Sequence, residues 1–206
     1  MRLLAFFRQP PEYINFCIAE LKSLFALHNI PAWEVFDFDC QETAELIKHK
    51  PYKLTKDMFP NFPFVYIKNH NEELLQQIIS RSILLKSFVR VISEGCGVDE
   101  LIKNVDQEEA KEIIESEDPM CFFVDSINKY YNRQEIIQMI EKFGALPFKG
   151  PINLSNPKKI FLVLEDWENN HITGQLEHKL KKSFFGLQIC KAGKGKESIN
   201  IKYELT

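Results

Sequence analysis

The stretch Leu146-Pro-Phe-Lys-Gly-Pro-Ile-Asn-Leu154, followed by Asn156-Pro-Lys-Lys-Ile-Phe-Leu-Val-Leu-Glu-Asp166, carries the most information in this chain. Pro147 and Pro151 fix the backbone φ angle at two places, which pre-orders the loop between them. Lys149 stands in the middle of that loop, and two lysines open the strand that follows. The loop is therefore either an ordinary solvated turn or a pre-ordered site for a polyanion.

The residues on either side of this loop predict a helix before it and a central strand after it. Asn132 to Phe143 has apolar residues at helical spacing and stops at Gly144. Ile160 to Leu164 is a nearly continuous apolar run, typical of a strand covered on both faces. A larger side chain at Gly150 is expected to damage the fold if the backbone φ there is positive.

Working outward, the remainder of the second half predicts a mixture of short helices and strands. The predicted segments are two acidic amphipathic helices within Val98–Glu117, a strand at Cys121–Ile127, a polar loop at Asn169–Lys182, and a closing pair of strands at Ser183–Cys190 and Ser198–Tyr203.

The first half predicts the order β-α-β-β-α-β. The predicted elements are a strand at Leu3–Phe7, a helix from Pro11 to near Asn29, strands at Trp33–Phe38 and Phe62–Lys68, a helix at Glu72–Ser82, and a strand at Ile83–Ser93. This order is the ferredoxin-like pattern. We therefore predict an α+β protein whose first domain is ferredoxin-like and spans residues 1–95, with an insertion loop at about 41–61. A second domain spans 96–206 and begins with an acidic helical connector at 96–118.

Charge is distributed unevenly between these parts. Residues 94–118 contain ten acidic residues against two lysines, whereas residues 129–196 contain twelve Lys or Arg against six acidic residues. A basic segment behind an acidic one predicts a polyanion-facing domain and a solvated connector. The candidate binding residues, some of which flank the hairpin around Gly193 and Gly195, are Lys149, Lys158, Lys159, Lys181, Lys182, Lys191, Lys194 and Lys196.

Catalytic, metal and targeting motifs are not apparent. The five histidines lack a clear acidic or cysteine partner, and Glu165 and Asp166 point to opposite faces if they are strand neighbours. Gly195-Lys196 is followed by Glu197, so the phosphate-loop motif fails. The five widely spaced cysteines predict reduced thiols, and no run of about twenty apolar residues suggests a membrane span. We expect a cytoplasmic protein that does not bind a membrane and has no catalytic or metal residues.

The motifs quoted first resemble a known family. Phe143 to Asp166, with its Leu-Pro-Phe-Lys-Gly and Val-Leu-Glu-Asp segments, is similar to the THUMP domain of the eukaryotic tRNA guanine-N2-methyltransferase that acts on position ten. The likeness extends to Phe185-Gly186 and to Ile199–Leu205. Upstream, Phe64 to Gly95 resembles the N-terminal ferredoxin-like domain of that enzyme.

This resemblance implies a THUMP-type α/β domain in residues 96–206, tRNA as the partner, and RNA binding by the lysines named above. THUMP domains are associated with holding the 3′ acceptor end of tRNA. In the family, S-adenosylmethionine and a small zinc-binding activator subunit belong to a further methyltransferase domain, which is expected to be absent from residues 1–206. No cofactor is expected in residues 1–206.

A second interpretation comes from a different functional class. The acidic segment and the absence of catalytic motifs also suit a non-catalytic interaction or regulatory protein, whose ferredoxin-like domain binds a small ligand or a partner. The two interpretations differ in where the lysines lie, because RNA binding requires most of them on one contiguous face.

Overall fold

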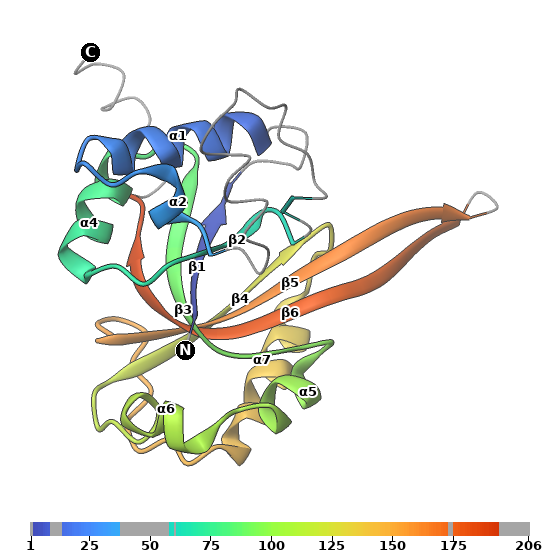
Figure 1. Ribbon diagram of the computed structural model, residues 1–206. Helices are drawn as coiled ribbons and strands as arrows, with labels where there is room; N and C mark the ends of the chain where they lie inside the picture. The colour runs from blue at the N-terminus through green and yellow to red at the C-terminus, as the bar shows by residue number, and fades with distance from the viewer. Residues whose placement is uncertain (1, 9–13, 38–57, 60, 173–174, 194–206) are drawn as a thin grey trace. The chain divides into compact units, whose positions relative to one another are not determined.

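A computed structural model provides the structure of this chain (Figure 1). It describes residues 2–8, 14–37, 58–59, 61–172 and 175–193, and for residues 169–172 and 175–177 it describes the backbone alone. The predicted insertion loop lies almost entirely outside the described residues, and the predicted strand Ser198–Tyr203 lies wholly outside them. Among the described residues, no helix is both long enough and apolar enough to cross a membrane.

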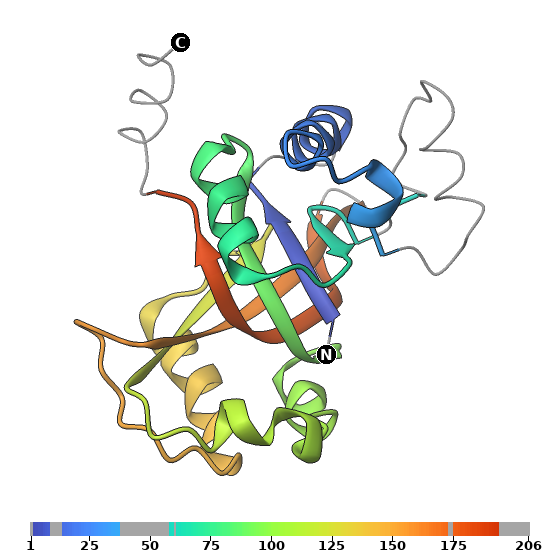
Figure 2. The same cartoon turned by 60° about the vertical axis from the view of Figure 1, so that its left-hand side comes forward.

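The chain divides into two compact units, which Figures 1 and 2 show from two sides. The N-terminal unit comprises residues 2–89 and 189–206, and the central unit comprises residues 90–188. Strands β3 (Leu85–Gly95) and β6 (Gln175–Lys191) contribute residues to both units. The predicted domain boundary near residue 95 stays a prediction.

The N-terminal unit is built from strands in the order β2-β1-β3 and from helices that cover them. Its other elements are β1 (Arg2–Phe7), α1 (Ile14–Ala26), α2 (Ala32–Val35), β2 (Phe64–Ile67) and α4 (Glu72–Arg81). β1 and β2 are antiparallel, with Leu3 opposite Ile67 and Phe6 opposite Phe64. Apolar side chains from α1 and α4, including Ile18 and Ile78, are fully buried in the core of this unit.

Two polar side chains fix the two ends of α4. Asn71 caps α4, because its side chain accepts a hydrogen bond from the backbone N–H of Leu74. Glu20 on α1 accepts hydrogen bonds from the Ser82 hydroxyl at 2.6 Å and from the Ile83 N–H at 2.7 Å. The turn between α4 and β3 is therefore hydrogen-bonded to α1.

The predicted strand at Trp33–Phe38 is wrong. Residues 32–35 form the single helical turn α2, and Phe36 alone makes an antiparallel bridge to Ile67. Val35 and Phe36 are adjacent and both fully buried, which is not the alternation of a strand with one face exposed to solvent. The element order remains ferredoxin-like, with the second strand reduced to one bridge.

The central unit contains strands in the order β3-β6-β5-β4. Strand β4 (Met120–Ile127) is parallel to β5 (Lys159–Ile172), and β5 is antiparallel to β6. Its helical elements are α5 (Val98–Lys103), α6 (Gln107–Ile114), α7 (Arg133–Lys142) and a 3-10 turn at Phe143–Ala145. The α+β class is thereby confirmed, and the two acidic helices lie where the sequence predicts them.

Phenylalanine rings form the core of the central unit. Phe122 on β4 packs against Phe161 on β5, with ring centroids 5.2 Å apart, and Phe143 packs against Phe185 at 4.6 Å. Such aromatic pairs stabilise a core beyond the area that they bury. The core thereby connects the start of β4 to the residues that follow α7.

The predicted polar loop at Asn169–Lys182 is also wrong. β5 continues to Ile172 and β6 begins at Gln175, so most of this segment is an antiparallel ladder that Figure 1 shows as two strands side by side. β4 ends opposite Asp166, and beyond that point β5 pairs with β6 alone. The hydrogen bonds between two strands are made by backbone N–H and C=O groups, so a polar composition does not exclude a ladder.

The cysteines that the structure describes are free thiols. Cys17, Cys121 and Cys190 are buried and Cys96 is exposed, whereas Cys40 lies outside the described residues. Burial raises the pKa of both the Cys17 and the Cys190 thiol to about 12. These two thiols are therefore unreactive core residues at neutral pH.

Candidate nucleic-acid interface

The loop that follows α7, residues 146–153, is fixed by its backbone to the start of β4. We call it the lysine loop. The Met120 N–H donates to the Pro151 carbonyl at 2.9 Å, and the Asn153 N–H donates back to the Met120 carbonyl at 2.8 Å. Ile152 thereby makes a parallel bridge with Met120. The loop is an ordered extension of the sheet edge, and Lys149 lies on a fixed backbone.

Gly150 is required in this loop because two chain segments approach closely. A Cβ atom added at Gly150 would lie 2.1 Å from the Asp118 carbonyl oxygen and 3.0 Å from the Ser116 carbonyl oxygen. Among the glycines that the structure describes, positive φ is recorded at Gly97 and not at Gly150. The sequence alone made the need for glycine depend on a positive φ at this position. The structure gives a different reason, the close approach of the Asp118 and Ser116 carbonyl oxygens.

Three of the predicted lysines lie around one acidic segment, residues 112–118. Lys149 Nζ is 2.5 Å from Glu115 Oε2, and Lys158 Nζ is 3.4 Å from Asp118 Oδ1. Lys159 Nζ donates to two backbone carbonyls in the last turn of α6, those of Glu112 and Ile113. A cation at this end of a helix is favourable, because the last carbonyls carry partial negative charge.

The ion pair of Lys149 affects the titration of both partners. The hydrogen bond between them raises the pKa of Lys149 and lowers the pKa of Glu115. Hydrogen bonds from Ser116 and from Lys158 likewise lower the pKa of Asp118. The pairs are solvent-exposed and screened by salt, so a phosphate group can take the place of the carboxylate at little cost.

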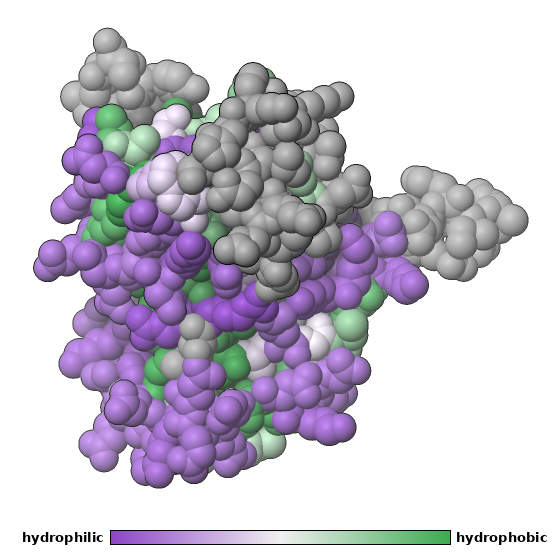
Figure 3. Space-filling view, in the orientation of Figure 1, coloured by the Kyte–Doolittle hydropathy of each residue, from purple (hydrophilic) through white to green (hydrophobic). Residues whose placement is uncertain are grey.

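The other predicted lysines fall into three places. Lys181 Nζ is 3.4 Å from Asp166 Oδ2, and Lys182 Nζ is 2.6 Å from Glu94 Oε2, both within the central unit. Lys191 is exposed and belongs to the N-terminal unit. Lys194 and Lys196 lie outside the described residues. On the face shown in Figure 3, hydrophilic residues cover most of the described surface.

Sequence reasoning missed a cluster at the carboxyl end of β4, where its parallel pairing with β5 ends. Glu165 is 2% exposed and accepts hydrogen bonds from the Tyr131 hydroxyl at 2.6 Å and from Trp167 Nε1 at 2.7 Å. Lys129 Nζ lies 3.7 Å from the centroid of the Trp167 ring and 4.7 Å from that of Tyr131. Burial, and then the hydrogen bond to Glu165, raise the pKa of Tyr131, which therefore stays a donor.

Glu165 and Asp166 are not an acid–base pair. Asp166 is 4% exposed and is paired with Lys181, whereas Glu165 has the two donors just described. Each carboxylate is satisfied by its own partners, as buried charges must be. The segment is thus a buried polar network and not merely the polar end of a strand.

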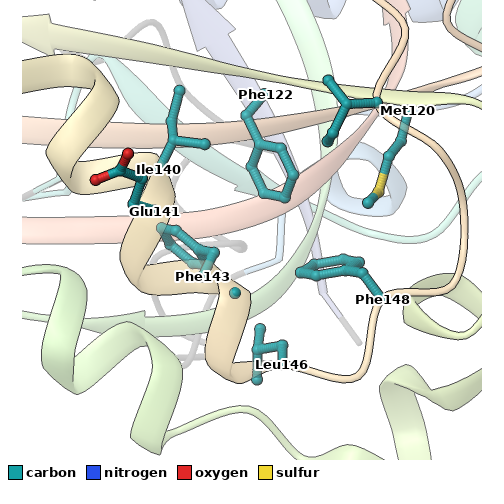
Figure 4. A pocket seen from close by; sticks show the side chains of 9 residues that line it. Met120, Phe122, Ile140, Glu141, Phe143, Leu146 and Phe148 are labelled. Carbon is teal, nitrogen blue, oxygen red and sulfur yellow. The ribbon is translucent and has the colours of Figure 1, made fainter.

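An apolar pocket of about 230 Å³ lies beside the lysine loop (Figure 4). Phe122, Phe143 and Phe148 contribute rings to its wall, and Glu141 is the one titratable residue that lines it. A single carboxylate offers neither a nucleophile nor an acid–base pair. Among the described residues, no group of three metal-ligating side chains could hold a metal ion.

Taken together, these observations describe a mixed α/β protein in which carboxylates pair with four of the candidate lysines. A family description, "Tmrp11 THUMP N-terminal domain", matches residues 1–194, and the chain belongs to this family. This match confirms the resemblance that the lysine loop and the strand after it indicate.

The curated relatives are tRNA (guanine(10)-N(2))-methyltransferases. The chain is 24% identical over 159 residues to the TRMT11 enzyme of Homo sapiens, covering 76% of this chain and 30% of that protein. It is 24% identical over 202 residues to the Saccharomyces cerevisiae enzyme, covering 94% and 40%. For Dictyostelium discoideum the identity is 25% over 208 residues, covering 95% and 38%. The chain thus spans about a third of the length of the relatives that it matches.

Two solved structures are similar at a low level. The crystal structure of PH1313 from Pyrococcus horikoshii Ot3 aligns with a TM-score of 0.44 and 11% identity, over 95% of this chain and 57% of that one. A 4-thiouridine synthetase–RNA complex with bound ATP aligns with a TM-score of 0.39 and 10% identity, over 89% and 42%. Likeness at this level carries no conclusion about function.

Proposed function

We infer that this chain is the tRNA-binding N-terminal module of a tRNA (guanine-N2)-methyltransferase, and that it positions tRNA for a catalytic domain outside residues 1–206. The observation that carries this proposal is the family match over residues 1–194, together with relatives that are tRNA (guanine(10)-N(2))-methyltransferases. No catalytic constellation was found among the described residues, which suits a module that binds tRNA and positions it.

Electrostatic attraction to phosphates is the proposed source of affinity. The proposed contacts are Lys149, Lys158, Lys159, Lys181, Lys182, Lys191, Lys194 and Lys196. Carboxylates hold four of these lysines in place, at the distances given above. Binding then exchanges each carboxylate for a phosphate and releases counterions from the RNA, so the affinity falls steeply with salt.

The methyl donor and the activator belong to the rest of the enzyme in this proposal. We propose that S-adenosylmethionine and a small zinc-binding activator subunit bind the methyltransferase domain, and that the enzyme works in the cytoplasm. A pull-down of the activator with residues 1–206 is then expected to recover no stoichiometric complex. Recovery of such a complex would contradict this assignment.

Filter binding of tRNA between 50 and 200 mM salt tests the proposed function. With several phosphate contacts, the affinity should fall by about a hundredfold or more across this range. Lys149→Glu with Lys159→Glu should weaken binding, whereas Lys68→Glu with Lys103→Glu changes the net charge equally at sites outside the proposed set. Undetectable binding at the lowest salt would contradict the proposal and favour a non-catalytic interaction protein.

A further inference from the structure

Among the residues whose side chains the structure describes, Tyr130 is a large aromatic residue that stands fully in solvent. Tyr130 is 99% exposed and lies between β4 and α7, in residues 128–132, which we call the tyrosine loop. Its sequence neighbours are polar or charged, among them Lys129 on one side and Arg133 at the start of α7. A ring with this exposure adds no buried area to the core.

The backbone on the strand side of Tyr130 is held in one conformation. The Ser126 hydroxyl donates to the carbonyl of Lys129. Asn128 has a φ of 64°, and its side-chain amide donates to the carbonyl of Trp167 at 2.9 Å. Asparagine tolerates this left-handed conformation better than most residues. The loop is thus fixed to both β4 and β5 immediately before the tyrosine.

The helix side is held equally firmly. The Asn132 side chain accepts from the N–H groups of Gln134 and Glu135, and the Glu135 carboxylate accepts from the Asn132 N–H at 2.7 Å. This capping box ties the last loop residue to the first turn of α7. Tyr131 is fixed by its bond to the buried Glu165.

Tyr130 therefore projects from an anchored backbone with its ring available on both sides. We propose that Tyr130 is a stacking platform for an unpaired base of bound RNA, with Lys129 and Arg133 close enough in the chain to meet the adjoining phosphates. Every base has a π face, so an aromatic ring beside cations binds single-stranded nucleotides of any sequence. Anchoring the backbone beforehand reduces the conformational entropy lost on binding.

The surroundings favour a base over a protein partner. The aromatic anchors of protein interfaces cluster near the centre of a patch, surrounded by other contact residues that exclude water. Tyr130 instead lies between Lys129 and Tyr131, whose hydroxyl is bonded to Glu165, and a second cation, Arg133, follows three residues later. An exposed ring with cations close to it in the sequence matches the chemistry of an unpaired nucleotide, which presents a flat base and an anionic backbone.

This inference rests on the proposed function and adds the residue that stacks. The test compares tRNA affinity for wild-type chain, Tyr130→Ala, Tyr130→Leu and Tyr130→Phe, with Phe16→Ala as an exposed aromatic control in the other unit. Tyr130→Ala and Tyr130→Leu should weaken binding about 5- to 150-fold, whereas Tyr130→Phe should stay within about twofold. The slope of log affinity against log salt should be unchanged, because no phosphate contact is removed.

Three results would overturn the inference in distinguishable ways. If Tyr130→Ala bound tRNA with wild-type affinity, Tyr130 would not be a stacking site, and the proposed function would be unaffected. Equal losses in Tyr130→Phe and Tyr130→Ala would assign the effect to the hydroxyl instead of the ring. No tRNA binding by the wild-type chain at low salt would overturn both the inference and the proposed function.

Discussion

The tyrosine loop precedes helix α7 and the lysine loop follows it, and the two loops carry different kinds of side chain, an aromatic ring and a cation. The lysine loop is held by backbone hydrogen bonds to Met120, and its Lys149 already has a carboxylate partner. The tyrosine loop is held by side-chain contacts to Glu165 and Trp167, and its Tyr130 is left in solvent. Lys149, which is conspicuous in the sequence, is thus already paired with a carboxylate in the fold. Tyr130, which is not conspicuous in the sequence, has its ring exposed to solvent.

Gly150→Ala breaks the lysine loop most directly. The new Cβ would meet the Asp118 carbonyl at 2.1 Å, and backbone on both sides would have to move. We expect a loss of about 3 kcal/mol in the free energy of unfolding, measured by urea denaturation. Gly144→Ala is the control, because an added Cβ there has no neighbour within 4 Å. Equal stability of the two variants would show that the close approach is absent.

Tyr131→Phe is the corresponding change in the tyrosine loop. It removes one of the two donors to the buried Glu165, and hydrogen bonds to charged groups contribute about 1.5 to 3 kcal/mol. Denaturation should show a loss of that size, whereas the adjacent Tyr130→Phe should leave stability nearly unchanged. A Tyr131→Phe variant as stable as the wild type would mean that Glu165 does not anchor the loop.

Glu115→Gln sharpens the comparison by freeing Lys149. Removing the carboxylate should raise tRNA affinity about two- to fivefold at low salt, because Lys149 no longer exchanges one partner for another. Glu117→Gln removes the same charge without this ion pair and should have a smaller effect on affinity in the same filter assay. Equal increases in tRNA affinity in both variants would show that the change in net charge alone causes the effect.

Acid pH should act on the same ion pair with a defined sign. The pKa of Glu115 is lowered in the folded chain, so its contribution to stability is complete above its unfolded pKa and is lost as pH falls through the folded value. Thermal unfolding followed below about pH 4.3 should show a smaller acid sensitivity for Glu115→Gln than for the wild type. Identical acid profiles would contradict the depressed pKa.

Periodicity predicted most of the helices and the buried strands. The apolar stripe after Asn132 predicted α7, although none of its residues is buried, and the apolar run Ile160–Leu164 predicted the centre of β5, where Phe161 to Leu164 are buried. The two segments that were predicted wrongly are weakly patterned. One turn of helix at Ala32–Val35 is too short for a repeat, and the sequence of the ladder beyond Asp166 is mostly polar, without a regular apolar alternation.

The candidate site was harder to predict than the fold, for a physical reason. Tyr131 and Glu165 are 34 residues apart, and Lys149 and Glu115 are equally far apart, so neither pairing leaves a local pattern. The sequence identifies which lysines exist, and the fold determines which carboxylates hold them. The one available signal was the Tyr130-Tyr131 pair between two asparagines, a polar turn that carries more aromatic surface than a turn needs.

The proposed RNA-binding role of the two loops is tested by one salt series on three proteins. The affinity for tRNA is measured against salt for the wild-type chain, for Lys149→Glu with Lys159→Glu, and for Tyr130→Ala. We predict weaker binding in both variants, with the salt slope reduced by about two units in the lysine variant and unchanged in the tyrosine variant. Wild-type affinity and slope in both variants would place the RNA-binding face away from both loops and contradict the account.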